Sequence, residues 1–248
     1  MKRDYLIHYS PCLEREMHVL VHGSSGLPIL VFPTQDSMCT NFEDFGMIET
    51  LSDYIENGHI QLFTVDTVDR ESWSDVYGNA EHRSWIQEQY YHYIVDEVVP
   101  VIHRYTGTDR QPVSAGCSLG ATHAGIVALR RPDLFSGCIA LSGIYDATYF
   151  TGGYIDSRWY DNSPIHFLRN MPEDHPYIDT YNHRKLIFCV GQGAWENEGI
   201  RTLRQMEGIF REKGINAWTD FWGYDVNHDW DWWKKQIRYF LPFVLETV

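Results

Sequence analysis

The sequence lacks the features that mark several classes of protein. No apolar run approaches the roughly 18 residues that a membrane-spanning helix needs, and no repeat, low-complexity tract or linker divides the 248 residues. Basic residues are the minority, with 20 Lys and Arg against 34 Asp and Glu and a formal net charge of −14. A nucleic-acid-binding protein normally shows a basic balance or stripe. We therefore expect no nucleic-acid partner and no binding to an anionic membrane.

Cysteine is scarce, and the chain has no metal-binding or phosphate-binding motif. It contains neither Cys-x-x-Cys nor His-Glu-x-x-His nor a glycine-rich phosphate loop, so we expect no metal and no cofactor. Residues 1–8 carry basic side chains but no apolar segment of the kind that a secretory signal needs. The five cysteines are odd in number and scattered, which is typical of free thiols in a cytoplasmic protein (Cys12, Cys39, Cys117, Cys138 and Cys189).

Short apolar stretches alternate with helical patterns along the chain. Helices are predicted at residues 81–106, 121–131, 200–213 and 230–247. Strands are predicted at residues 16–22, 27–32, 59–66, 113–116, 136–141, 185–190 and 216–222. This alternation predicts an α/β fold, with a mostly parallel central sheet covered by helices on both faces, in one domain over residues 1–248.

Three local signals add detail to this outline. The turn residues 23–26 predict a hairpin between the first two predicted strands. Pro100 should interrupt or kink the long helix, because it lacks the amide proton of the helical ladder, and Gly107 should end that helix. Residues 146–169 fit no pattern, and either a functional loop or a surface excursion over the sheet edge accounts for them.

The strongest chemical signal is Gly116-Cys-Ser-Leu-Gly120, placed between an apolar strand and a helix. A Gly-x-Ser-x-Gly motif in this context predicts a nucleophile elbow, in which strained backbone angles expose the hydroxyl of Ser118. The amide of Leu119, at the start of the helix, could then stabilise an oxyanion. The alternative is a glycine-rich packing turn. Cys117 is expected to be a small packed residue.

A serine nucleophile needs a base and an acid, which follow it in this order along the chain. His228 lies between the last predicted strand and the last helix, and we prefer it to His183, which lies in a polar stretch. Glu196 is our first choice for the acid and Glu198 our second. The alternative is that both glutamates complement the positive N-terminus of the following helix.

The second oxyanion donor is expected in residues 32–37, after a central strand. The Gln35 amide is our first choice, and Thr34 is next. Aromatic residues near the predicted site suit apolar acyl groups, phenolic acids and sugar rings, although about half of them are expected in the core. The candidate substrate contacts are Tyr154, Trp159, Trp195 and Trp230.

The chain resembles the putative-esterase branch of the α/β-hydrolases, which includes S-formylglutathione hydrolases, feruloyl and siderophore esterases and mycolyltransferases. The resemblance is carried by residues 116–121 (GCSLGA), 131–143 (RPDLFSGCIALSG) and 227–233 (NHDWDWW). It implies an α/β-hydrolase fold without a separate cap domain, a Ser118 nucleophile, a His228 base and an acid near Glu196. Two positions depart from the family: Pro33-Thr34 replaces a frequent His-Gly, and Ala194 stands where the acid usually lies.

These observations predict a serine carboxylic-ester hydrolase that acts on a small-molecule ester through a Ser-His-acid triad and an acyl-enzyme, without a cofactor. Two alternatives remain open. One is an acyltransferase that uses the same triad, and the other is a non-catalytic binding protein that retains the fold. A homodimer also remains open.

Overall fold

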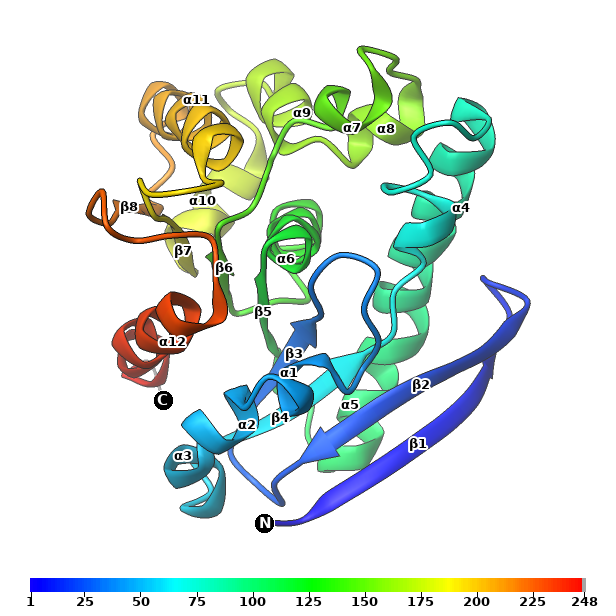
Figure 1. Cartoon of the computed structure of the whole chain (residues 1–248), viewed down its shortest axis with the longest axis vertical. Helices are drawn as coiled ribbons and strands as arrows, with labels where there is room; N and C mark the ends of the chain where they lie inside the picture. Colours follow the sequence, from blue (N-terminus) through cyan, green and yellow to red (C-terminus); the bar gives the residue numbers. More distant parts are fainter. Residues whose placement is uncertain (247–248) are drawn as a thin grey trace.

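The centre of the structure is an eight-stranded sheet in the spatial order β1-β2-β4-β3-β5-β6-β7-β8 (Figure 1). A computed structural model describes residues 1–246. β2 pairs antiparallel with β1 and β4, and all other neighbours pair in parallel, which confirms the mostly parallel sheet. The strands are β1 Arg3–Ser10, β2 Arg15–His22, β3 Leu27–Phe32, β4 Ile60–Val65, β5 Val113–Cys117, β6 Gly137–Leu141, β7 Lys185–Val190 and β8 Trp218–Phe221.

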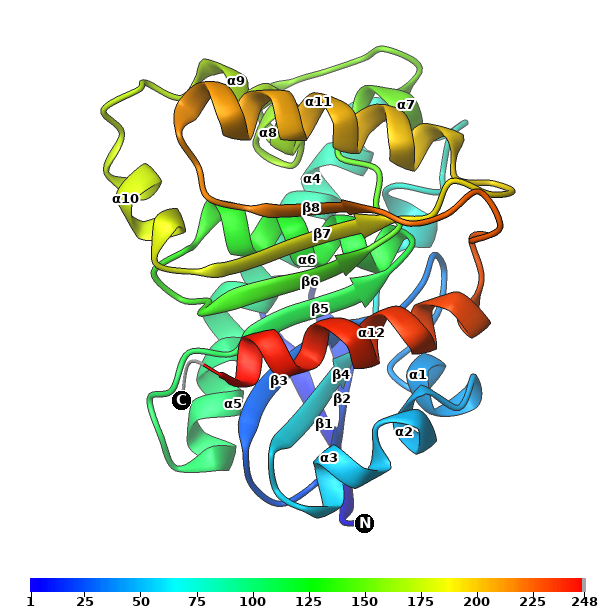
Figure 2. The same cartoon turned by 90° about the vertical axis from the view of Figure 1, so that its left-hand side faces the viewer.

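Helices cover both faces of the sheet, as predicted. One apolar cluster joins α1–α3 and α12 to one face, and a second cluster joins α4–α6, α9 and α11 to the other (Figures 1 and 2). The helices are α1 Asn41–Asp44, α2 Met47–Thr50, α3 Ser52–Glu56, η1 Asp69–Glu71, α4 Ala80–His92, η2 Tyr93–Val98, α5 Val99–Thr106, α6 Leu119–Arg130, α7 Thr148–Thr151, α8 Ser157–Asp161, α9 Pro164–Asn170, α10 Pro176–Asn182, α11 Asn197–Lys213 and α12 Trp230–Leu245.

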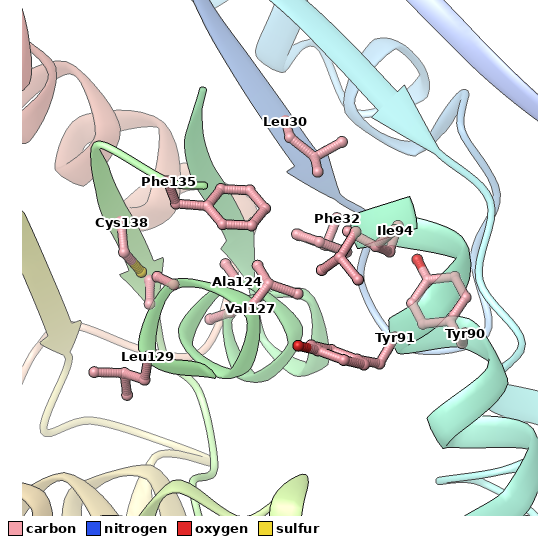
Figure 3. Packing of buried hydrophobic residues seen from close by; sticks show 14 of the residues in the cluster. Leu30, Phe32, Tyr90, Tyr91, Ile94, Ala124, Val127, Leu129, Phe135 and Cys138 are labelled. Atoms are coloured by element: carbon pink, nitrogen blue, oxygen red, sulfur yellow. The ribbon is translucent and has the colours of Figure 1, made fainter. Parts of the chain in front are cut away.

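Helix α6 is buried along most of its length and is fixed against the sheet. Leu30 and Phe32 of β3 lie in one buried cluster with Ala124 and Val127 of α6 and Ile94 of η2 (Figure 3). Packing on two sides leaves α6 little freedom to shift. The first turn of α6, which follows Ser118, is therefore held at the carboxyl end of β5.

The predicted hairpin between the first two predicted strands is wrong, and the sequence gives no prediction for β1. This strand forms the real hairpin with β2. Residues 23–26 do turn the chain, with Gly23 at φ 97° and Gly26 at φ 110°. However, β2 and β3 do not pair, because β4 lies between them and pairs with both. Such long-range pairing is not encoded in the local turn residues.

The long predicted helix forms as three consecutive segments. α4 passes into the π-helical η2, and α5 follows with Pro100 in its first turn. A π-helical turn relieves the conflict between the proline ring and the preceding carbonyls, so the predicted interruption occurs just before Pro100. Gly107 ends α5 in the left-handed conformation at φ 68°, as predicted. The last helix ends at Leu245, and residue 247 of its predicted range lies outside the described residues.

Residues 146–169 are not an irregular loop. They fold into α7, α8 and most of α9, and these three helices lie next to one another at the top of the view in Figure 1. Their pattern is hard to detect because α7 and α8 have only 4 and 5 residues. The described residues form a single domain with no separate cap. None of their helices is both long enough and apolar enough to cross a membrane.

Candidate active site

Ser118 occupies a strained turn between β5 and α6. Its backbone angles are φ 57° and ψ −128°, outside the regions that side-chain-bearing residues favour. The flanking glycines leave room for this turn. A Cβ on Gly116 would lie 2.3 Å from the carbonyl of Gly120, and a Cβ on Gly120 would lie 2.4 Å from the carbonyl oxygens of Phe32 and Pro33. The motif is thus required by close backbone contacts.

Ser118, His228 and Glu196 form one chain of hydrogen-bonding contacts. His228 Nε2 lies 2.8 Å from Ser118 Oγ, and His228 Nδ1 lies 3.0 Å from Glu196 Oε2. If the Nδ1 proton is donated to the carboxylate, Nε2 is left as an acceptor for the serine hydroxyl. The glutamate is 1% exposed, so water does not compete for its oxygens.

The two loops that carry His228 and Glu196 are joined to each other. The His228 amide donates to the Ala194 carbonyl (3.0 Å), and the Ala194 amide donates to Asn227 Oδ1 (2.8 Å). Gly193 has no Cβ, and an added one would lie 2.4 Å from Asn227 Oδ1. These contacts fix the histidine relative to Ala194, two residues before the proposed acid.

The other candidates for the base and the acid lie elsewhere. Glu198 accepts a 2.8 Å hydrogen bond from Arg201 on the surface of α11. His183 lies after α10, beside a cavity that also contacts the first residues of β3, β5 and β7, at the opposite end of the sheet from Ser118. The structure therefore places His228 and Glu196, the preferred candidates for the base and the acid, next to Ser118.

Two backbone amides near Ser118 are unengaged. Within residues 1–246, neither the Leu119 amide nor the Gln35 amide donates a hydrogen bond, and both residues line the cavity at Ser118. The Thr34 amide instead donates to Asn41 Oδ1 at 3.0 Å. Its proton is already used, so the geometry favours Gln35 over Thr34 as the second donor.

The cavity at Ser118 has a volume of about 330 Å³. Of the four aromatic residues predicted to contact substrate, only Trp195 lines it; this residue is 88% exposed and has φ 67°. The full lining comprises Gln35, Ser118, Leu119, Thr122, Ser142, Ile144, Tyr149, Phe150, Trp195 and His228.

The other three predicted aromatic contacts lie outside this lining. Trp159 is fully buried and packs 4.6 Å from Trp73, so it offers no surface to a substrate. Trp230 stacks on Phe45 at 4.7 Å. Tyr154 is 41% exposed and donates to Asp156 on the surface. Composition indicates aromatic enrichment near the site, but long-range packing decides which rings reach the cavity.

Sequence reasoning missed several residues at the site. Phe150 of α7 reaches the cavity because residues 146–169, which fit no sequence pattern, fold into short helices over it. Ser142 donates to Glu196 Oε1 at 2.6 Å, and Trp233 Nε1 donates to Ser142 Oγ at 3.0 Å. A lone serine after a strand carries no motif, so no local signal identified it.

The neighbouring Cys117 is fully buried, and burial raises the pKa of its thiol well above the ordinary value. The thiol is therefore protonated at neutral pH and is a packed residue, as expected. Within the part of the chain that the structure describes, no three His, Cys, Asp or Glu side chains are grouped so that they could hold a metal ion.

Comparisons with known proteins identify the fold and the family of the chain. A ferulic acid esterase is similar at a TM-score of 0.76 and 16% identity, over 100% of this chain and 98% of that chain. An S-formylglutathione hydrolase from Agrobacterium tumefaciens is similar at a TM-score of 0.74 and 14% identity, over 98% of this chain and 94% of that chain. MPT51 of Mycobacterium tuberculosis is similar at a TM-score of 0.77 and 15% identity, over 99% of this chain and 98% of that chain. At these identities the likeness establishes the α/β-hydrolase type of fold. A sequence search of curated proteins found no match. The family described as "Putative esterase" matches residues 10–243, and the chain therefore belongs to this family of carboxylic-ester hydrolases.

Proposed function

We propose that the protein is a serine carboxylic-ester hydrolase with Ser118 as nucleophile, His228 as general base and acid, and Glu196 as the acid that orients the histidine. The observation that carries the proposal is the contact chain from Glu196 through His228 to Ser118, at 3.0 and 2.8 Å. A serine hydroxyl is a weak nucleophile until an adjacent base removes its proton.

The reaction follows from this chain of contacts. Ser118 Oγ attacks the ester carbonyl carbon while His228 Nε2 takes the hydroxyl proton, and the buried carboxylate of Glu196 stabilises the resulting imidazolium. Collapse of the tetrahedral intermediate breaks the ester bond, and His228 returns the proton to the departing alcohol. Water then attacks the acyl-enzyme by the same route, which releases the carboxylic acid and restores Ser118.

The oxyanion that develops on the carbonyl needs donors aimed at it. The unengaged amides of Leu119 and Gln35 suit this role, because both border the cavity beside Ser118. Removing one such donor typically costs about 100- to 1000-fold in kcat. The cavity of about 330 Å³ is lined mainly by uncharged side chains, which favours a small neutral ester.

A cytoplasmic location is proposed alongside this function. All five cysteines are free, four of them buried, in agreement with a reducing compartment.

The decisive test is hydrolysis of an activated aryl acetate together with labelling by a fluorophosphonate probe. The wild type should turn over the ester and be labelled, whereas Ser118→Ala should lose both properties and remain folded. Turnover retained by Ser118→Ala would contradict the role of this serine. A folded wild type that is neither active nor labelled would instead favour a binding protein.

A further inference from the structure

A second histidine–carboxylate pair lies buried behind the proposed oxyanion site. Asp69 belongs to η1, and His123 belongs to α6, the helix that begins directly after Ser118. His123 Nε2 lies 2.9 Å from Asp69 Oδ1, and the two side chains are 2% and 0% exposed. Neither residue lines the cavity at Ser118, so a direct chemical role in ester cleavage is excluded.

Two further contacts of Asp69 lead to the loop that carries Gln35. Asp69 Oδ2 accepts a 3.3 Å hydrogen bond from the amide of Asp36. Its backbone carbonyl accepts the amide of Ser74 at 2.8 Å, and Ser74 Oγ in turn accepts Gln35 Nε2 at 2.8 Å. Two sets of contacts therefore hold Gln35 in place. One fixes the peptide that follows it, through the carboxylate of Asp69, and the other fixes its side chain, through Ser74 and the Asp69 carbonyl.

The imidazole of His123 is itself held in one place. It stacks on Phe32, with ring centroids 5.7 Å apart and planes 21° apart, and Trp73 and Tyr90 pack edge-on against it. Phe32 is the last residue of β3, immediately before the oxyanion loop. The pair thus joins α6 to the loop at the point where the loop leaves the sheet.

Stability alone does not account for a buried pair of this kind. Burial desolvates both polar groups, which offsets much of the gain from their hydrogen bond, and replacement of both partners by apolar groups can be nearly neutral or stabilising. The carboxylate of Asp69 does make a geometric connection. It contacts His123 of the helix that begins with Leu119, and it accepts the Asp36 amide in the loop that carries Gln35.

We propose that Asp69 and His123 are positioning residues that hold the Gln35 amide in register with the Leu119 amide. This inference rests on the proposed function, since it assigns the pair to the oxyanion site of the same reaction. A displacement of about 1 Å at a catalytic group can cost on the order of 100-fold in rate.

The test compares three variants. Asp69→Leu combined with His123→Leu removes the side-chain link from His123 to the Asp36 amide but leaves an apolar, foldable interior, and kcat should fall about 10- to 100-fold with KM within about twofold. Asp69→Asn can still accept the Asp36 amide and donate to His123, so it should retain most of kcat. The matched control replaces Arg130, at the far end of α6, and its partner Glu88 with leucine. It should leave kcat unchanged.

Hydrogen exchange of the amides in residues 34–38 supplies a readout that does not depend on ester cleavage. Exchange should be about fivefold faster in the double-leucine variant of Asp69 and His123, the factor expected for one ordinary hydrogen bond, and unchanged in the other two variants. Unchanged exchange in that double variant would overturn the inference, whatever happens to kcat. An unchanged kcat in the presence of faster exchange would also overturn it. A wild type without esterase activity but with the expected exchange pattern would refute the proposed function and leave the mechanical link intact.

Discussion

The hydroxyl of Ser142 donates a 2.6 Å hydrogen bond to Oε1 of Glu196, while Oε2 of the same carboxylate faces His228. Ser142 is itself held by Trp233 Nε1 at 3.0 Å, and its backbone has φ 62°. The rings of Trp233 and His228 also pack in a T-shaped arrangement, with centroids 4.9 Å apart. The proposed acid is thus oriented from two sides, and the residue that orients it is in turn fixed by the first turn of α12.

Ser142→Ala should lower kcat by about tenfold, because a hydrogen bond to a charged group contributes roughly 1.5–3 kcal/mol and the buried Oε1 would lose its donor. Steady-state kinetics on an aryl acetate measures the change. Ser136→Ala is the matched control, since Ser136 Oγ donates to the Gln111 carbonyl at the opposite end of β6. A similar loss of kcat in both variants would contradict the orienting role of Ser142.

Glu196→Gln should reduce kcat by about 10⁴-fold. An amide can hold the imidazole but does not compensate its positive charge, and it also favours the unproductive tautomer. Glu198→Gln should change kcat less than about twofold, because the Glu198 carboxylate pairs with Arg201 on the surface of α11. If Glu198→Gln were the more damaging change, the assignment of the acid would be wrong.

The difference between these two glutamates shows which parts of the site can be predicted from the sequence. The nucleophile turn is predictable, because Gly116, Ser118 and Gly120 lie in a local strand-to-helix context. The preference for Glu196 follows from chain order and from the family resemblance, and its structural support comes from its burial against Ser142, a contact across 54 positions. The position of Trp159 depends in the same way on Trp73, in a distant loop. Contacts of this kind leave no periodic signal in the sequence.

Gly120→Ala should destabilise the protein by about 2–3 kcal/mol or prevent folding, because the added methyl group would lie 2.4 Å from two backbone oxygens. Gly208→Ala offers the control within helix α11, where nothing lies within 4 Å of the added Cβ. That variant should gain up to about 1 kcal/mol from improved helix propensity. Urea unfolding of both variants tests the prediction, and equal midpoints would contradict it.

Trp195→Gly should separate substrate binding from stability. Glycine tolerates the φ of 67°, and the indole is 88% exposed, so the free energy of unfolding should change by no more than about 1 kcal/mol. The indole lines the cavity, and its loss should raise KM for aryl esters about 2- to 10-fold, the value of one aromatic contact. The KM for a short alkyl ester serves as the control. An equal change for both esters would argue against contact with an aryl group.

Stability should decline as the pH falls below about 7, and His22 should account for part of the decline. This imidazole is 2% exposed, and within residues 1–246 neither ring nitrogen has a hydrogen-bond partner. Burial lowers the pKa of His22 below its ordinary value of 6.5; nearby Arg3 acts in the same direction and Glu43 opposes it. Burial also lowers the pKa of His8. The charges of Arg104 and His18 lower this pKa further, whereas Glu97 raises it.

The sign follows from proton binding in the two states. At pH 7.5 both the folded and the unfolded chain keep these imidazoles mostly neutral, so they contribute little. As the pH falls through 6.5, the unfolded chain binds protons that the folded chain resists, and the free energy of unfolding decreases. Urea unfolding of wild type and His22→Leu at pH 7.5 and pH 5.5 measures this effect. The variant should lose less stability than the wild type between the two pH values. Part of the pH dependence that remains is assigned to His8. An identical loss of stability in both proteins would show that His22 does not cause the effect.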